Sequence, residues 1–353
     1  MFGKQHPGWF SGSIFFVVWV LLSGCQSAEA PQRQTYQTLE GKTMGTYYRI
    51  TFGGQDPGGL QSAFDSLFVA LNNEVSTYIP DALISQFNQS DSGMPLPESA
   101  LHFQGNFLLA AEVFRQTAGA FDPTVMPLVN YWGFGYTEKK PVTAVDSAKI
   151  REIMGWVGFD AVLQYEVSPL VIQKTAPAVQ LDFSACAKGY GVDLAGHLLE
   201  SRGVTDYFID IGGEVLAKGL SSRGDAWNVG IQTPREDAGV GEVQAVVPLE
   251  NLAVATSGNY RNYYEVEGRK YSHTINPFTG FPERSTLLSV SVFHASCAVA
   301  DAYATAFMVM GQEKAYQMAL TREDLEAYFI VANPDGSLGE TYTPGLKAYF
   351  SPE

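Results

Sequence analysis

Helical and strand-like segments alternate irregularly along this chain, and that irregularity is what most limits its possible folds. Apolar residues recur at helical spacing over residues 60–77, whereas residues 46–52 alternate as a strand does. From residue 168 onward short strand patterns dominate, interrupted by helical patterns at about 188–201 and 298–322. A doubly wound parallel sheet needs a regular strand–helix–strand rhythm, which this order lacks. We therefore predict an α+β fold with mixed, largely antiparallel sheets and flanking helices.

The remaining patterns fill in this α+β prediction. Further helices are expected at 98–117 and 145–157, with an aromatic loop at 119–135 between them. Other strand patterns occupy residues 169–174, 179–183, 207–219, 227–234, 252–258, 262–268, 287–293 and 327–334. The chain has 353 residues, of which 46% are hydrophobic, and it shows no internal repeat. We expect one compact domain with a substantial core.

The N-terminus carries a secretion signal. Lys4 precedes the apolar run IFFVVWVLL, which is much shorter than the ~20 residues of a membrane-spanning helix. The run ends in Leu-Ser-Gly-Cys, which matches the lipobox of bacterial lipoproteins, with Cys25 as the acylated residue. We predict a signal peptide at 1–24, a lipidated Cys25 with a flexible tether at 25–37, and a catalytic domain at 38–353. The domain would then be periplasmic and anchored through lipid to the inner or outer membrane.

Net charge restricts the ligands that this chain can bind. The formal charge is -15, and loss of the segment containing Lys4 makes it about -16 by the same count. Nucleic acids are disfavoured as partners, because phosphate backbones require clustered Lys and Arg. A phosphorylated ligand would need a divalent metal to offset the repulsion. Cys186 and Cys297 lie among apolar or small residues, which favours buried thiols over a disulfide and resembles no zinc site.

Three groups of residues could carry chemistry. Asp301 and Thr305 are four residues apart, so on a helix they share one face and offer hard oxygen ligands suited to Mg²⁺, although a helix cap is the simpler role for Asp301. Lys188 lies near a helix start, where a cation opposes the dipole; an anionic ligand explains it, as does a surface position. His273 precedes a polar turn and could act as a base, or be structural. Asp193 and His197 read as a structural pair.

Eight segments in order resemble the FAD:protein FMN transferase family, called ApbE, over nearly the whole mature chain. They are Lys42–Thr46, Ser76–Asn88, Gly119–Gly135, Leu181–Asp193, Ile209–Glu214, Ala255–Tyr264, His273–Gly280 and Ala300–Gly311. The resemblance implies an ApbE-like, T-fold-like architecture and an exported enzyme. Such an enzyme binds FAD and Mg²⁺, releases AMP, and attaches FMN through a phosphoester to a threonine of an acceptor protein. Family acceptors are subunits of membrane-bound redox complexes.

The resemblance also assigns residues. The positions that match the FAD contacts are Met44, Tyr78, Ala120, Phe121, Asp122, Asp182, Lys188 and Ile275. The metal positions are Asp301, Thr305 and Ala185, the last through its backbone carbonyl, and the catalytic position is His273. One departure is Ala304, where some members place a further carboxylate, so that a water or ligand oxygen would have to complete the metal site.

Three other functions remain open on the sequence. An FAD pyrophosphatase would use the same cleft and metal with water as the nucleophile. A flavin-binding lipoprotein without catalysis would hold FAD and release no AMP. A scaffold or solute-binding lipoprotein would show no Mg²⁺-dependent flavin affinity.

Overall fold

The computed structural model describes residues 35–137, 145–235, 239, 241–259, 263–266 and 269–350, together with residues 1, 3 and 8. Cys25, the tether before residue 35 and nearly all of the signal peptide lie outside this part. The chain divides into residues 1–33 and 34–353, and the second unit contains the fold. No helix among the described residues is long and apolar enough to cross a membrane.

One eight-stranded sheet organises the domain. Its order is β1-β2-β6-β7-β10-β13-β14-β15, and every neighbouring pair is antiparallel. The strands are β1 (Tyr36–Thr43), β2 (Thr46–Gly53), β6 (Tyr207–Ile211), β7 (Glu214–Lys218), β10 (Leu252–Gly258), β13 (Leu287–His294), β14 (Glu326–Ala332) and β15 (Leu338–Tyr342). The alternation of apolar residues along β2 and β6 follows from this arrangement, because only one side of each strand faces the helices.

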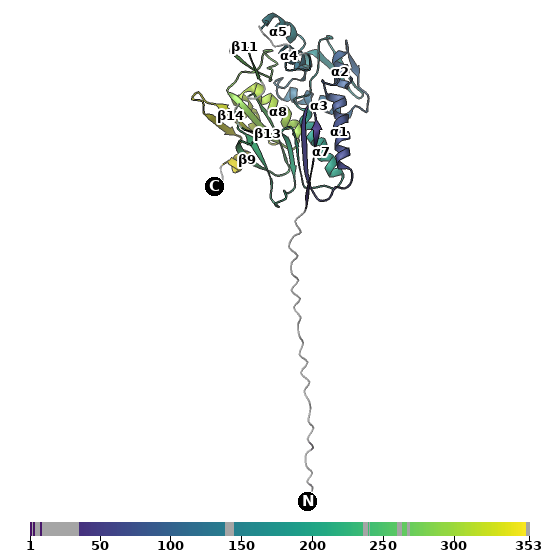
Figure 1. Ribbon diagram of the computed structural model, residues 1–353, viewed down its shortest axis with the longest axis vertical. Helices are drawn as coiled ribbons and strands as arrows, with labels where there is room; N and C mark the ends of the chain where they lie inside the picture. The colour runs from purple at the N-terminus through teal and green to yellow at the C-terminus, as the bar shows by residue number, and fades with distance from the viewer. Residues whose placement is uncertain are drawn as a thin grey trace. The chain divides into compact units, whose positions relative to one another are not determined.

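Helices cover one face of this sheet, as Figure 1 shows. α7 packs on β6 and β7, α8 packs on β10 and β13, and α9 packs on β14, while α3 lies against α1 and α8. The bounds are α1 (Leu60–Val75), α2 (Leu83–Gln89), α3 (Leu101–Gln116), α7 (Ala187–Ser201), α8 (Cys297–Met310) and α9 (Gln312–Leu320). The main core lies between these helices and the sheet. It includes the two cysteines Cys186 and Cys297 and most side chains of α8.

A two-stranded sheet packs on the other face. β8 (Trp227–Gln232) pairs with β9 (Val243–Leu249), and α10 (Lys347–Phe350), which follows the 3-10 turn η2 (Pro344–Leu346), packs beside β9. Buried Val247 and Leu249 join Val215 and Phe293 of the large sheet in a second core. Both faces of the sheet are therefore buried around β7 and β13.

Smaller elements complete the domain. They are β3 (Gly93–Pro95), η1 (Pro123–Val125), α4 (Met126–Tyr131), α5 (Ser147–Met154), α6 (Phe159–Val162), β4 (Leu163–Val167), β5 (Leu170–Lys174), β11 (Tyr263–Val266) and β12 (Arg269–Ser272). Three of them, α4, α5 and β11, lie at the top of Figure 1. β3, β5 and β4 form a three-stranded sheet in that order, and β11 pairs with β12. Trp132 is buried there against Tyr271, with its ring stacked at 5.3 Å, and its Nε1 donates to the Gly280 carbonyl at 2.8 Å.

The α+β prediction with antiparallel sheets is confirmed, and three local predictions are wrong. Residues 179–183 form no strand, because the Asn88 side chain takes the hydrogen bonds that a neighbouring strand would make. The helix expected at 298–322 breaks at Gly311, whose φ of 74° ends α8 before α9 begins. The expected loop at 119–135 contains η1 and α4. Cys186 and Cys297 are buried free thiols, as the sequence favoured.

Candidate functional site

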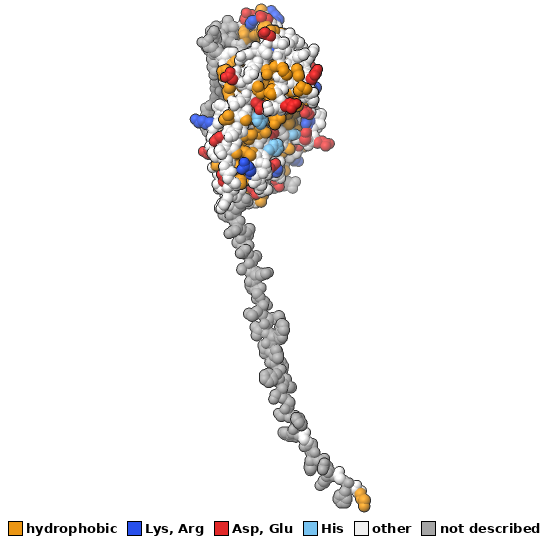
Figure 2. Space-filling view, turned by 90° about the vertical axis from the view of Figure 1, so that its right-hand side faces the viewer, with side chains coloured by type: hydrophobic (Ala, Val, Ile, Leu, Met, Phe, Trp, Pro, Cys, Tyr) orange, Lys and Arg blue, Asp and Glu red, His pale blue; other side chains and the backbone are white. Residues whose placement is uncertain are grey.

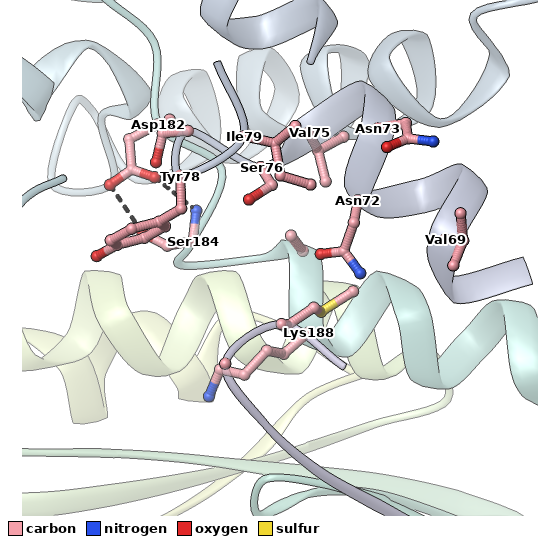
Figure 3. Close-up of a pocket in the computed structure, with 14 residues that line it drawn as sticks. Val69, Asn72, Asn73, Val75, Ser76, Tyr78, Ile79, Asp182, Ser184 and Lys188 are labelled. Carbon is pink, nitrogen blue, oxygen red and sulfur yellow. Dashed lines mark hydrogen bonds between the residues drawn. The ribbon is translucent and has the colours of Figure 1, made fainter. Parts of the chain in front are cut away.

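A pocket of about 780 Å³ opens between the β1–β2 turn, α1 and the start of α7. Figure 3 shows Asp182 and Tyr78 on one side of it, Asn72 and Val69 on the other, and Lys188 below. Its lining residues are Met44, Gly45, Val69, Asn72, Asn73, Val75, Ser76, Thr77, Tyr78, Ile79, Asp182, Ser184, Ala187 and Lys188. Four predicted FAD-contact positions thus share one pocket.

Met44 enters this pocket from a tight turn. Met44 and Gly45 both have positive φ, 49° and 71°, which is the backbone of a two-residue hairpin turn between β1 and β2. Gly191 lies opposite on α7, and a Cβ added there would sit 3.0 Å from the Met44 methyl carbon. The absence of a side chain at residue 191 therefore leaves room for Met44 against the helix.

Asp182 is held by its own neighbours. Its carboxylate accepts hydrogen bonds from the Ser184 backbone N–H at 2.9 Å and from the Ser184 hydroxyl at 2.7 Å. Its backbone N–H donates to the Pro123 carbonyl at 2.8 Å. Burial raises the pKa of Asp182, and burial together with the Asp182 charge raises the pKa of Tyr78, whose ring is exposed above the pocket.

Ala120, Phe121 and Asp122, which precede Pro123, are buried and are not part of the pocket lining. Asp122 caps η1, since its carboxylate accepts from the Thr124 backbone N–H at 2.8 Å and from the Thr124 hydroxyl at 2.6 Å. Burial raises the pKa of Asp122 to about 6 despite these bonds. The segment is linked to the pocket through Pro123, whose carbonyl binds Asp182.

A buried charge cluster lies beneath the pocket. Lys188 Nζ is 2.6 Å from Glu214 Oε1, and the Glu214 side chain is only 4% exposed. Asp301 Oδ2 accepts from the Gly189 backbone N–H at 3.0 Å, which joins α8 to the first turn of α7. Burial and the charge of Glu214 raise the pKa of Asp301 to about 8. The pKa of Lys188 is raised as well: burial opposes its charge, and Glu214 and Asp301 outweigh that penalty.

This cluster decides between the alternatives for Lys188 and Asp301. Lys188 is ion-paired and only 32% exposed, so it is no ordinary surface lysine. Asp301 does not cap α8, because Ser296 is the N-cap and Asp193 of α7 accepts from the Cys297 and Ala298 N–H groups. Asp193 has a structural role at the N-terminus of α8, but the predicted pair with His197 is not formed by a hydrogen bond or ion pair within the described residues.

The other two predicted metal positions offer a hydroxyl oxygen, at Thr305, and a backbone carbonyl oxygen, at Ala185. The Thr305 hydroxyl lies 3.4 Å from the Ser257 hydroxyl, and Ala185 is half-buried just before α7. Glu214 Oε2 is buried, and it has no hydrogen-bond partner in the part of the chain that the structure describes. No three His, Cys, Asp or Glu side chains come together as a metal-binding group within the described residues.

His273 lies at the end of β12 and is exposed. Its ring meets Phe134 edge-on at 6.4 Å. The following turn is well ordered by Asn276, whose side-chain oxygen accepts from the Phe278 and Thr279 N–H groups at 2.9 and 3.2 Å. Ile275 is buried and forms an isolated bridge with Pro282, so it anchors the turn from below.

Sequence reasoning missed two parts of the site. One is the α1 wall, where Asn72 donates to the Thr43 hydroxyl at 3.0 Å; its helical pattern gave no sign of which polar residues face a ligand. The other is Glu214. A carboxylate in the apolar strand pattern after Gly212 and Gly213 needs a buried partner, and that signal could have identified it.

Comparisons with known proteins place this arrangement in a family. The model described as "ApbE family" matches residues 44–329. A Vibrio cholerae protein named FAD:protein FMN transferase is 36% identical over 94% of this chain and 96% of its own length. The solved Flavin Transferase ApbE from Vibrio cholerae matches with a TM-score of 0.79 at 35% identity, over 90% of this chain and 99% of that one. The apo Pseudomonas stutzeri flavinyl transferase ApbE matches with a TM-score of 0.79 at 30% identity, over 91% and 98%. The chain belongs to the ApbE family.

Proposed function

We propose that this protein transfers FMN from FAD to a threonine hydroxyl of an acceptor protein and releases AMP. The observation that carries the proposal is the pocket beside the Lys188–Glu214–Asp301 cluster in a chain of this family. Its volume of about 780 Å³ falls within the range of cofactor sites. Relatives named FAD:protein FMN transferase match along nearly their whole length, which supports the same reaction here.

The donor set fits a bound Mg²⁺. Asp301 and Thr305 lie four residues apart on α8, and Glu214 has one buried carboxylate oxygen without a hydrogen-bond partner among the described residues. Burial and the charge of Glu214 raise the pKa of Asp301, and a cation beside the two carboxylates would favour their ionised forms. We propose that Asp301, Thr305 and the Ala185 carbonyl hold the ion. When bound, Mg²⁺ would neutralise the FAD pyrophosphate and the charge that develops on departing AMP.

The chain's own residues account for the rest of the reaction. Lys188 supplies a second positive charge toward the pyrophosphate, and Asp182 with Tyr78 orients the ligand from the pocket wall. His273 takes the proton from the acceptor hydroxyl as its oxygen attacks the FMN phosphorus. The bond from that phosphorus to the AMP oxygen breaks, and AMP leaves with the electron pair. The exposure of His273 at a turn suits an acceptor that arrives as a folded protein.

We also propose a location and a class of partner. The lipobox at Cys25 supports a lipid-anchored protein in the periplasm, and acceptors there would be subunits of a membrane redox complex. Signal peptide cleavage and acylation can be checked directly, by measuring the mass of the N-terminal peptide from membrane-extracted protein. An intact residue 1–24 segment would contradict this location.

The test of the reaction uses protein lacking residues 1–34, incubated with FAD, Mg²⁺ and a threonine-bearing candidate acceptor. We expect AMP in a 1:1 ratio to acceptor that has gained the mass of one FMN. His273→Ala and Asp301→Ala should each lose at least ~100-fold in rate, as expected for a base and a metal ligand. AMP with free FMN and unmodified acceptor would favour the pyrophosphatase. Bound FAD without AMP would favour a carrier.

A further inference from the structure

Lys174, the last residue of β5, is a buried cation surrounded by backbone oxygens. Its side chain is 7% exposed, and its ammonium lies over the Phe87 ring at 5.3 Å. Four main-chain carbonyl oxygens lie within hydrogen-bond distance of its Nζ, and they share its three N–H groups: Phe87 at 3.1 Å, Asn88 at 3.2 Å, Pro177 at 3.1 Å and Val179 at 3.0 Å. The first two belong to the end of α2 and the other two to the irregular segment 175–186. One ammonium therefore joins two backbone segments.

The Asn88 side chain reinforces the same junction. Its Nδ2 donates to the Leu181 carbonyl at 2.9 Å, and its Oδ1 accepts from the Leu181 N–H at 2.7 Å. Leu181 directly precedes Asp182, which lines the pocket. Residues 179–183 have no strand partner, so these side-chain contacts take the place of a sheet ladder in fixing the backbone there.

Packing alone does not explain a lysine at this position. A buried ammonium costs free energy unless it is compensated, and Asp91 is the one carboxylate of the described residues that acts on its charge. A Met or Leu would fill the same volume without that cost. The compensation comes from carbonyls of the segment that leads into the pocket, so the cation gains its partners only when that segment is in place.

We propose that Lys174 is a positioning residue for FAD binding, which holds the segment 177–182 so that Asp182 faces the pocket. The inference rests on the proposed function, which assigns FAD to this pocket. Lys174 itself touches no ligand. Its loss should weaken FAD binding while leaving the phosphoryl transfer step largely intact once FAD is bound.

Lys174→Met is the decisive variant, since it keeps the length of the side chain and removes every donor. We expect the dissociation constant for FAD, measured by quenching of flavin fluorescence with Mg²⁺ present, to rise at least tenfold, and the rate of AMP release at saturating FAD to change by less than threefold. Lys174→Gln, which retains two donors, should have a dissociation constant for FAD between those of the wild type and Lys174→Met. Lys218→Met is the matched control, because it removes an exposed lysine paired with Glu200 and should bind FAD as the wild type does.

A purely structural role would lower the melting temperature of Lys174→Met and leave the FAD dissociation constant of the folded protein unchanged, which would overturn the inference. If Lys174→Met does not fold, Lys174→Gln is judged by the same criterion. Wild-type protein that binds no FAD would refute the proposed function and this inference together. If the wild type and Lys174→Met bind FAD equally well, this inference is refuted and the proposed function is not.

Discussion

At the scale of single residues, the site is defined by carboxylates that have been taken out of water and compensated in different ways. Asp182 and Asp122 are bound by neighbouring Ser and Thr, whereas Glu214 and Asp301 share Lys188. The spacing of Asp301 and Thr305 was visible in the sequence because a helix fixes which residues share a face. For Glu214 the apolar strand pattern indicates only that the carboxylate needs a buried partner, and it does not identify Lys188, which lies on another element.

Asp122 should make stability depend on pH. Its pKa is raised to about 6, so the folded protein binds the proton more tightly than the unfolded chain does. The resulting contribution, at most roughly 3 kcal/mol, is present below pH ~4 and is lost as the pH rises through 6. Urea unfolding between pH 4 and 7 should show this fall in wild type, and a flatter profile in Asp122→Asn. Parallel profiles for the two proteins would contradict the prediction.

Glu214→Gln should destabilise the protein by about 1–3 kcal/mol, because the half-buried Lys188 then loses its ion pair and keeps only the charge of Asp301 nearby. Lys188→Met combined with Glu214→Gln should recover part of that loss, since no unpaired cation remains. Chemical unfolding at pH 7 measures the free energy of unfolding of the single and the double variant. The control is Glu40→Gln, which removes an exposed pair with Arg49 and should cost less than ~1 kcal/mol. Equal losses at residues 40 and 214 would argue against a buried pair.

At the scale of secondary-structure elements, α7 and α8 meet almost backbone to backbone. A Cβ at Gly189 would lie 2.3 Å from the Cys297 carbonyl oxygen, so only glycine permits this approach. The sequence predicted both helices to within a few residues of their starts. It did not predict their contact, and it mistook residues 179–183 for a strand because apolar alternation there reflects packing of a segment that side chains hold.

Gly189→Ala should therefore destabilise the protein by at least ~2 kcal/mol, since either the helices separate or the backbone shifts. The separation would also lengthen the bond from the Gly189 N–H to Asp301 and reduce AMP release. Gly241→Ala, where a Cβ meets nothing within 4 Å, serves as the control and should be neutral. Thermal unfolding of both variants provides the comparison, and an unaffected Gly189→Ala would show that the interface adapts.

At the scale of the whole molecule, the charge of -15 opposes the approach of FAD, which carries an anionic pyrophosphate. With EDTA present, the affinity for FAD should rise severalfold as salt increases from 0.01 to 0.15 M, because the Debye length shortens from ~30 to ~8 Å. Riboflavin, which has no phosphate, should show no such response. An identical salt dependence for the two flavins would mean that local groups outweigh the overall charge.

The strand order of the large sheet also affects how the chain folds during synthesis. β2 is bonded to β1 on one side and on the other to β6, which lies far along the chain, with Tyr48 opposite Ile211. Until β6 has been made, the inner edge of β2 has no partner and can pair with another molecule. Pairings between distant segments form slowly. Folding yield should thus depend on a chaperone during synthesis, and a chain that stops before β6 would expose an aggregation-prone edge of β2 rather than act as a weaker enzyme.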